Sequence, residues 1–144
     1  MLVRNILDAK GNRVVTTQPE ATISATSRLL SEHRIGAVLV TDKSGKIVGV
    51  MSERDIVNGM ARHGAAVTDH TVADLMTRNV HTCQPGDTIA EVMAVMTERR
   101  IRHLPVLADG RLSGMISIGD VVKYRLDEAK LEVDSLREYV LAAH

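Results

Sequence analysis

The chain has 144 residues, 44% of them hydrophobic, and its 18 basic side chains balance 18 acidic ones. This balance excludes an overall charge that would draw the protein to nucleic acid or to an anionic membrane, so any anion site must be local. No apolar run approaches the roughly 20 residues that a membrane span needs, and residues 1–12 lack the apolar stretch of a signal peptide. We therefore expect a cytoplasmic protein with neither a membrane nor a nucleic acid as partner.

Several other site types lack their usual residues. Tyr124 and Tyr139 are the only Phe, Trp or Tyr residues, which argues against the base stacking typical of single-stranded nucleic acid binding. Cys83 has no second cysteine for a disulfide or a CxxC pair, so it is either a reactive thiol or, more simply, a small semi-buried residue. No metal is expected, because metal-ligand spacing is absent from the histidines His33, His63, His70, His81 and His144.

In the first half of the chain, the turn signal at residues 42–45 (DKSG) predicts a loose hairpin between two short strands. Ser52 is then placed to cap a helix, with Asp55 in the first turn, where an acidic side chain suits the helix dipole. Residues 59–71 are rich in small and polar residues and indicate a linker between the two halves.

In the second half, Thr88 and Glu91 form a capping box that predicts a helix, whose core face carries Ile89, Val92, Met93 and Met96. Short strands are expected at residues 104–107 and 112–116, on either side of the tight Asp109-Gly110 turn. A last helix begins near Ser117 with Asp120 in its first turn. Its apolar pattern runs on toward Tyr139 through Val122, Leu126, Leu131 and Leu136.

The two halves repeat each other with a period of about 65 residues. The corresponding segments are 14–19 and 80–85, 34–40 and 100–106, and 46–57 and 111–122. Each half predicts strand, helix, strand, turn, strand and helix, so the fold class is α/β (α+β). We assign repeat 1 to residues 1–66, repeat 2 to residues 72–130, and a C-terminal helical extension to residues 131–144. A unit of this size has little core of its own, so we expect the two repeats to fold together.

The chain resembles the cystathionine-β-synthase (CBS) domain family over nearly its whole length. The resemblance rests on Gly49-x-x-Ser52-x-x-Asp55 and Gly114-x-x-Ser117-x-x-Asp120, each after a hairpin strand, and on residues 103–106 (HLPV). The first repeat has AVLV at residues 37–40 instead. The resemblance implies two tandem β-α-β-β-α repeats packed as one pseudo-symmetric module, with two clefts that bind AMP, ADP, ATP, NAD or S-adenosylmethionine.

In that family the motif aspartate accepts hydrogen bonds from ribose hydroxyls, and the serine three residues before it lies close to ribose or phosphate. These roles carry over to Asp55 and Asp120, and to Ser52 and Ser117. A carboxylate that accepts two hydrogen bonds suits a cis diol, and a hydroxyl beside exposed helix N–H groups suits phosphate. The structural alternative is that the aspartates are simple helix-start acids and the serines simple caps.

Adenine needs a flat apolar slot edged by backbone donors and acceptors. For the second site, the candidate residues are Val80, His81, Thr82, His103, Leu104 and Pro105. For the first site, they are Val15, Thr16, Thr17, Gly36, Ala37 and Val38. Arg54 and Arg102 are candidate phosphate clamps, because a guanidinium fork matches phosphate oxygens. Alternatively, His103 is a packed strand residue and both arginines are solvated.

No P-loop, G-x-S-x-G or G-x-G-x-x-G motif appears, and the repeat occupies the whole length, so no enzyme is expected. The leading hypothesis is a regulatory sensor that binds an adenine nucleotide and modulates an unknown partner protein. The alternatives are a constitutive dimeric scaffold with empty clefts and a small enzyme acting on a nucleotide in the cleft. We also expect a homodimer, from the apolar periodicity after Asp120 and from the disc-like assemblies of the family.

Overall fold

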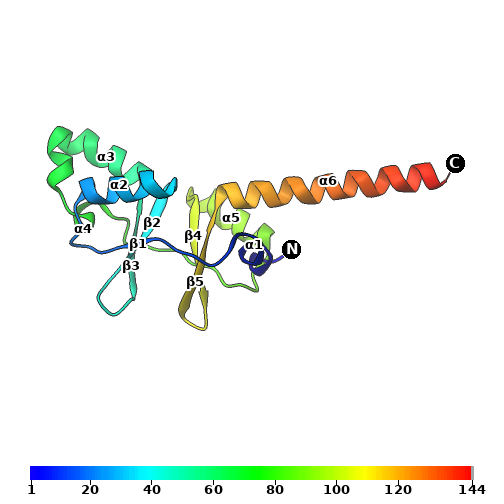
Figure 1. Ribbon diagram of the computed structural model, residues 1–144, viewed down its shortest axis with the longest axis horizontal. Helices are drawn as coiled ribbons and strands as arrows, with labels where there is room; N and C mark the ends of the chain where they lie inside the picture. The colour runs from blue at the N-terminus through cyan, green and yellow to red at the C-terminus, as the bar shows by residue number, and fades with distance from the viewer. Residues whose placement is uncertain (144) are drawn as a thin grey trace. The chain divides into compact units, whose positions relative to one another are not determined.

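A computed structural model describes residues 1–143, so His144, the last residue of the expected extension, lies outside the described part (Figure 1). The mixed α/β architecture expected from the sequence is confirmed. The elements in chain order are α1 (Val3–Lys10), β1 (Thr16–Thr17), α2 (Ile23–His33), β2 (Ala37–Thr41), β3 (Ile47–Ser52), α3 (Glu53–His63), the 3-10 helix η1 (Gly64–Asp69), α4 (Val72–Leu75), α5 (Ile89–Arg99), β4 (His103–Ala108), β5 (Arg111–Ser117) and α6 (Ile118–Ala142).

The chain packs as two compact units. One unit is the continuous segment Arg13–His81, and the other joins residues 1–12 to the chain from Thr82 onward. This division by packing differs from the division by sequence repeat, since the N-terminal helix α1 packs with the second repeat and not with the first. The expected linker at residues 59–71 is folded into the first unit, where α3 runs to His63 and η1 follows.

The unit of residues 13–81 is built on a three-stranded sheet in the order β1-β2-β3. β1 pairs in parallel with β2, and β2 pairs antiparallel with β3. Helix α2 begins at Thr22, whose hydroxyl accepts a hydrogen bond from the backbone of Ala25. Its apolar face joins the sheet and η1 in one core, with the buried residues Ile23, Leu30, Val38, Val40, Met51, Val67, Val72, Leu75 and Met76.

The second unit is built on the antiparallel hairpin β4–β5, with Leu104 opposite Ile116. The first strand expected in this repeat is reduced to a single parallel bridge between Cys83 and Val106. The hairpin turns at Asp109 and Gly110, both with positive φ, as the sequence predicts. Helices α1 and α5 and the start of α6 share its core, with the buried residues Val3, Ile6, Leu7, Cys83, Ile89, Val92, Met96, Leu104, Val106, Ile116 and Val121.

Each unit contains a short segment that we call its docking segment, which begins at residue 1 in one unit and at residue 70 in the other. The two docking segments make equivalent backbone contacts, each within its own unit. Val3 donates to the carbonyl of Asp87 at 2.9 Å, and Val72 donates to that of Ala21 at 2.8 Å. In return, the N–H of Ile89 donates to the carbonyl oxygen of Met1, and the N–H of Ile23 donates to that of His70. The segments that begin at residues 1 and 70 are therefore structural equivalents, although their surrounding sequences differ.

The motif glycines are explained by these docking segments. A Cβ on Gly114 would lie 2.6 Å from Leu7 Cδ2, which packs directly on β5. A Cβ on Gly49 would lie 2.7 Å from Met76 Sδ and 3.0 Å from the carbonyl oxygen of Thr77. Only glycine lets the docking segments approach the strands this closely.

Both glycine-to-alanine variants should therefore destabilise the fold, and Gly49→Ala should do so more than Gly114→Ala. The flexible end of Leu7 can move aside, whereas the backbone oxygen of Thr77 cannot, so we expect about 1 to 3 kcal/mol for the worse variant. Urea unfolding measures both. Gly86→Ala is the control, because its Cβ would meet only an arginine tip at 3.4 Å. Equal and negligible effects at all three positions would contradict this account.

Candidate functional site

The two motif helices, α3 and α6, begin with the same serine–aspartate capping box. In the second repeat, the backbone N–H of Asp120 donates to Ser117 Oγ at 3.2 Å, and the N–H of Ser117 donates to Asp120 Oδ2 at 2.9 Å. In the first, the corresponding distances between Asp55 and Ser52 are 3.3 and 2.9 Å. The structural role considered for both serines is therefore present, and it fixes each carboxylate at the junction of strand and helix.

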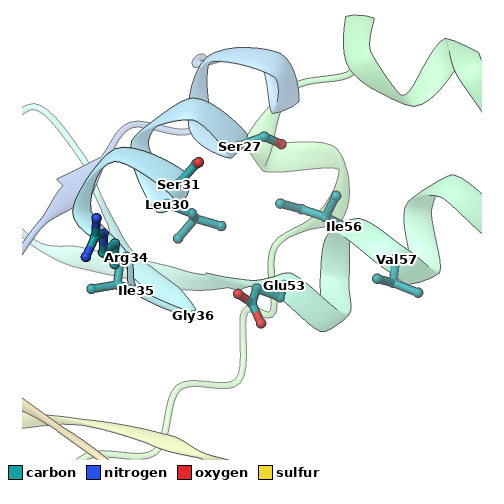
Figure 2. Close-up of a pocket in the computed structure, with 9 residues that line it drawn as sticks. All are labelled: Ser27, Leu30, Ser31, Arg34, Ile35, Gly36, Glu53, Ile56 and Val57. Carbon is teal, nitrogen blue, oxygen red and sulfur yellow. The ribbon is translucent and has the colours of Figure 1, made fainter.

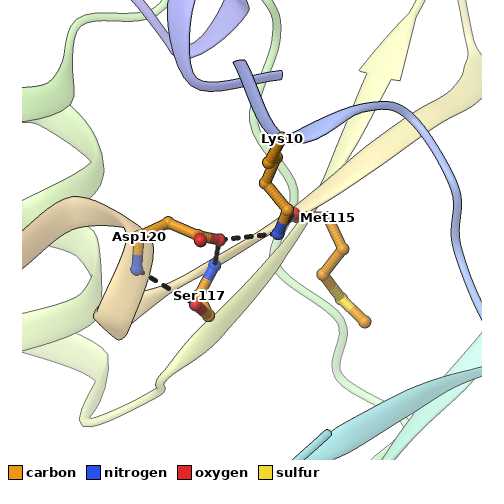
Figure 3. Close-up of polar contacts among 4 residues, drawn as sticks. All are labelled: Lys10, Met115, Ser117 and Asp120. Carbon is orange, nitrogen blue, oxygen red and sulfur yellow. Dashed lines mark hydrogen bonds and ion pairs between the residues drawn. The ribbon is translucent and has the colours of Figure 1, made fainter. Parts of the chain in front are cut away.

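Asp120 carries a further partner that the sequence analysis did not anticipate (Figure 3). Lys10, the last residue of α1, places its Nζ 2.7 Å from Asp120 Oδ2 and 2.9 Å from the carbonyl oxygen of Met115. The two side chains are 38% and 23% exposed. Burial acts to raise the pKa of Asp120, but hydrogen bonds from Lys10 and Ser117 and the Lys10 charge outweigh it and hold that pKa below its usual value. Asp120 is thus an anion at neutral pH.

Asp55 has a neutral partner instead, on the carboxylate oxygen that does not accept from the motif serine. Thr77, just after α4, donates its hydroxyl to Asp55 Oδ1 at 3.1 Å, and its backbone pairs with Val50 of β3. Within residues 13–81, the unit to which Asp55 belongs, no lysine, arginine or histidine lies within ion-pair distance of Asp55. The two motif sites therefore differ in charge although their capping geometry is the same.

The predicted lining of the second site lies partly around Ser117. His103 and Ser117 are paired across the β4–β5 hairpin, so His103 begins its strand beside the motif serine. The next two residues, Leu104 and Pro105, are buried, and the carbonyl of Pro105 accepts a hydrogen bond from Cys83. Thr82 is exposed in the same unit, whereas the partly exposed Val80 and His81 belong to the other one.

The first site is arranged in the same way. Ala37 pairs with Ser52 across β2 and β3, as His103 pairs with Ser117. Ala37 and Val38 are 2% and 0% exposed, so both residues are buried in the sheet. The remaining candidates differ in position: Val15 is half-buried, Thr16 is exposed on β1, Thr17 is half-buried, Gly36 precedes β2, and Arg54 and Arg102 are exposed.

A groove lies between α2 and α3 in the unit of residues 13–81 (Figure 2). Gly36 is the only predicted site residue that lines it; Ser52 and Asp55 do not. The lining combines an apolar floor with polar edges, and consists of Ser27, Leu30, Ser31, Arg34, Ile35, Gly36, Glu53, Ile56 and Val57. This groove is therefore a separate surface from the motif site.

Three other features bear on chemistry. The Cys83 thiol is buried, and burial raises its pKa to about 12, which argues against a reactive thiolate. Residues 1–143 contain no group of three His, Cys, Asp or Glu side chains placed to hold a metal. None of the described helices combines the length and the apolar character needed to cross a membrane.

The fold agrees with the comparison of the chain with known families. Residues 4–62 and 72–127 match the CBS domain family, and the chain belongs to it. A CBS-domain containing protein of Agrobacterium tumefaciens has a similar crystal structure, with 47% sequence identity and a TM-score of 0.85. That comparison covers 86% of this chain and 92% of the other.

Two further relatives add context. The CBS domain-containing protein CBSX3, mitochondrial, of Arabidopsis thaliana is 34% identical over 116 residues, which are 77% of this chain and 56% of that relative. The chain therefore spans little more than half the length of that protein. The CBS domain pair of protein MJ0100, solved in complex with 5′-methylthioadenosine and S-adenosyl-L-methionine, is 26% identical with a TM-score of 0.77. This comparison covers 86% of this chain and 98% of that pair.

The Lys10–Asp120 pair gives a prediction about acid. Because the folded-state pKa of Asp120 lies below its unfolded value near 3.8, the pair stabilises the fold above that pH and ceases to do so as pH falls through the folded-state pKa. Lys10→Met should therefore cost up to about 1 kcal/mol at pH 7 and less at pH 3. Urea unfolding of wild type and variant at both values measures this difference, and a cost that does not change with pH would contradict the ion pair.

Proposed function

We propose that this protein is a regulatory module that binds an adenine nucleotide, namely AMP, ADP, ATP or NAD. The observation that carries the proposal is the carboxylate of Asp120, which is ionised, fixed by its capping box and partly exposed. Its Oδ2 is held by Lys10 and Ser117, while Oδ1 accepts no hydrogen bond from the described residues of its own unit. A free carboxylate oxygen is what a ribose hydroxyl requires.

The surroundings of Asp120 support the same proposal. His103 and Ser117 lie together at the end of the hairpin, and the buried backbone of Leu104 and Pro105 follows. We assign to Ser117 the role of contacting ribose or phosphate, and to His103 through Pro105 one edge of the adenine slot. Thr82, which is in the same unit, is proposed for the same slot. The adenosine ligands of the MJ0100 pair favour this ligand class.

For the first repeat we propose a weaker site formed by Ser52, Asp55, Arg54, Thr16, Gly36, Ala37 and Val38. Both carboxylate oxygens of Asp55 already accept hydrogen bonds, from Ser52 and from Thr77. A ribose would have to displace or share one of these partners. This occupied carboxylate is also the observation that favours the second candidate function, a constitutive scaffold whose sites stay empty.

We further propose that the module acts in the cytoplasm on a partner protein and is not itself an enzyme. Nucleotide control of a partner requires that the ligand bind one conformation more tightly than another. We propose that the conformations in question differ within the compact units, in how the docking segments pack.

A homodimer is proposed from the exposed face of α6. Six residues on this helix follow the spacing 4-3-4-3-4 typical of a coiled coil, and all are exposed. We call them the apolar stripe: Val122, Leu126, Ala129, Val133, Leu136 and Val140. They line up with a groove formed by the last two turns of the helix, lined by Val133, Leu136, Arg137, Val140 and Leu141. We assign this face to a second copy of the chain.

The charges beside the stripe favour two parallel helices. In the heptad register that puts Leu126, Val133 and Val140 at a, the three e positions are all basic: Lys123, Lys130 and Arg137. An antiparallel pair would bring these basic rows together, whereas a parallel pair sets Glu132 of one copy opposite Arg137 of the other. Val133 and Val140 at a with Leu136 at d also match the combination that favours two strands.

The nucleotide site is tested by Asp120→Ala, which should weaken AMP or ATP binding at least about tenfold. Loss of two charge-assisted hydrogen bonds, each worth about 1.5 to 3 kcal/mol, exceeds the 1.4 kcal/mol that a tenfold change needs. Calorimetric titration measures the affinity, and thermal melts check the fold. Asp55→Ala is the control and should have a smaller effect on binding. Unchanged affinity in Asp120→Ala would leave Asp120 as a helix-start acid.

The dimer surface is tested by Leu136→Glu, which should shift the protein toward monomer because it buries a charge at the centre of the stripe. Leu131→Glu is a matched control, since Leu131 and Leu136 are both 64% exposed but Leu131 lies off the stripe. Sedimentation at micromolar concentration separates the outcomes. A wild-type monomer, or equal effects of the two variants, would contradict the proposed coiled coil.

A further inference from the structure

The ion pair between Lys10 and Asp120 leaves hydrogen-bonding capacity on both side chains unused by the unit that contains it. An ammonium group has three donors, and Lys10 directs two of them, to Asp120 Oδ2 and to the carbonyl oxygen of Met115. The Lys10 side chain is 38% exposed, so its third donor is open to solvent. Asp120 likewise keeps Oδ1 without a partner among the described residues of its own unit. The pair therefore presents a free anionic acceptor beside a free cationic donor (Figure 3).

This combination matches the two polar ends of a nucleoside monophosphate. The ribose hydroxyls need an acceptor, which Asp120 Oδ1 supplies, and the phosphate needs a cationic donor, which Lys10 supplies. The charge balance matters as much as the hydrogen bonds. With Lys10 in place the pair is neutral, whereas an unpaired Asp120 would repel a phosphate by Coulomb's law while still accepting ribose hydroxyls.

The first repeat shows what the same site is like without the cation. The docking segments begin at equivalent residues, and each delivers one side chain to the motif aspartate of its own unit. In one unit that side chain is Lys10, and in the other it is the hydroxyl of Thr77. Asp55 therefore has no cationic partner from its own unit, whereas Asp120 has one.

We propose that Lys10 is a specificity-determining residue, which makes the site at Asp120 select phosphate-bearing adenosine compounds over the neutral nucleoside. The site at Asp55, where Thr77 and no cation of the same unit contacts the carboxylate, does not make this selection. Lys10 stays at Asp120 when the ligand binds and adds the phosphate as its third partner. This inference rests on the proposed nucleotide function, but it makes a separate claim, about charge and not about adenosine.

AMP and adenosine test the claim, because they share base and ribose and differ only in the phosphate. Calorimetric titration of the full-length protein should show tighter binding of AMP than of adenosine at the site that Asp120→Ala removes. Lys10→Met should weaken AMP binding about tenfold or more and change adenosine binding by less than about threefold. Lys10→Arg keeps the charge and should retain most of the preference. Lys43→Met, which removes a lysine exposed in the β2–β3 turn, should leave both affinities unchanged.

The outcomes separate this inference from the function on which it rests. Equal loss of AMP and adenosine binding in Lys10→Met, with melts that show an intact fold, would make Lys10 a structural tie and overturn the inference alone. Tighter AMP binding in Lys10→Met would also overturn it, since Lys10 would then block the site. Wild-type protein that binds neither of these compounds, nor ADP, ATP or NAD, would overturn both the inference and the proposed function.

Discussion

The close contact between a docking segment and a β-hairpin is the constraint on which the rest of this structure depends. Leu7 lies so near Gly114 that no side chain fits between them, and Met76 lies equally near Gly49. These contacts carry each segment to the end of the hairpin, where the motif helix begins. Lys10 and Thr77 reach the two motif aspartates for that reason. The glycine and the aspartate of each motif are thus parts of a single arrangement. The glycine allows the docking segment to approach the hairpin, and the aspartate binds the polar side chain at the end of that segment.

The local elements could be predicted because their signals lie within a few residues of each other. The capping box of Thr88 and Glu91 begins α5, and Ile89, Val92 and Met96 on its predicted face are buried. Asp109 and Gly110 turn the second hairpin, and Ser52 and Ser117 each cap a helix. The repeat itself then identified the family.

What could not be predicted depends on contacts between distant parts of the chain. Helix α1 has no N-terminal capping signal in the sequence, and its apolar side chains are buried because the distant β4–β5 hairpin and α5 cover them. Lys10 therefore resembles any surface lysine until the fold places it at Asp120. The role of Thr77 was unpredictable for the same reason, because only its backbone pairing with Val50 brings its hydroxyl to Asp55. The candidate aspartates and serines were predictable, but their partners were not.

The account makes Asp120 the point where a ribose binds and Lys10 the point where its phosphate binds. A crystal structure of the full-length protein grown with AMP tests this most directly. The account predicts that the ribose hydroxyls donate to Asp120 Oδ1 and that Lys10 Nζ contacts the phosphate while remaining on Oδ2. AMP bound away from Asp120, or a saturating concentration of AMP that leaves the carboxylate in contact with Lys10 and Ser117 alone, would contradict it.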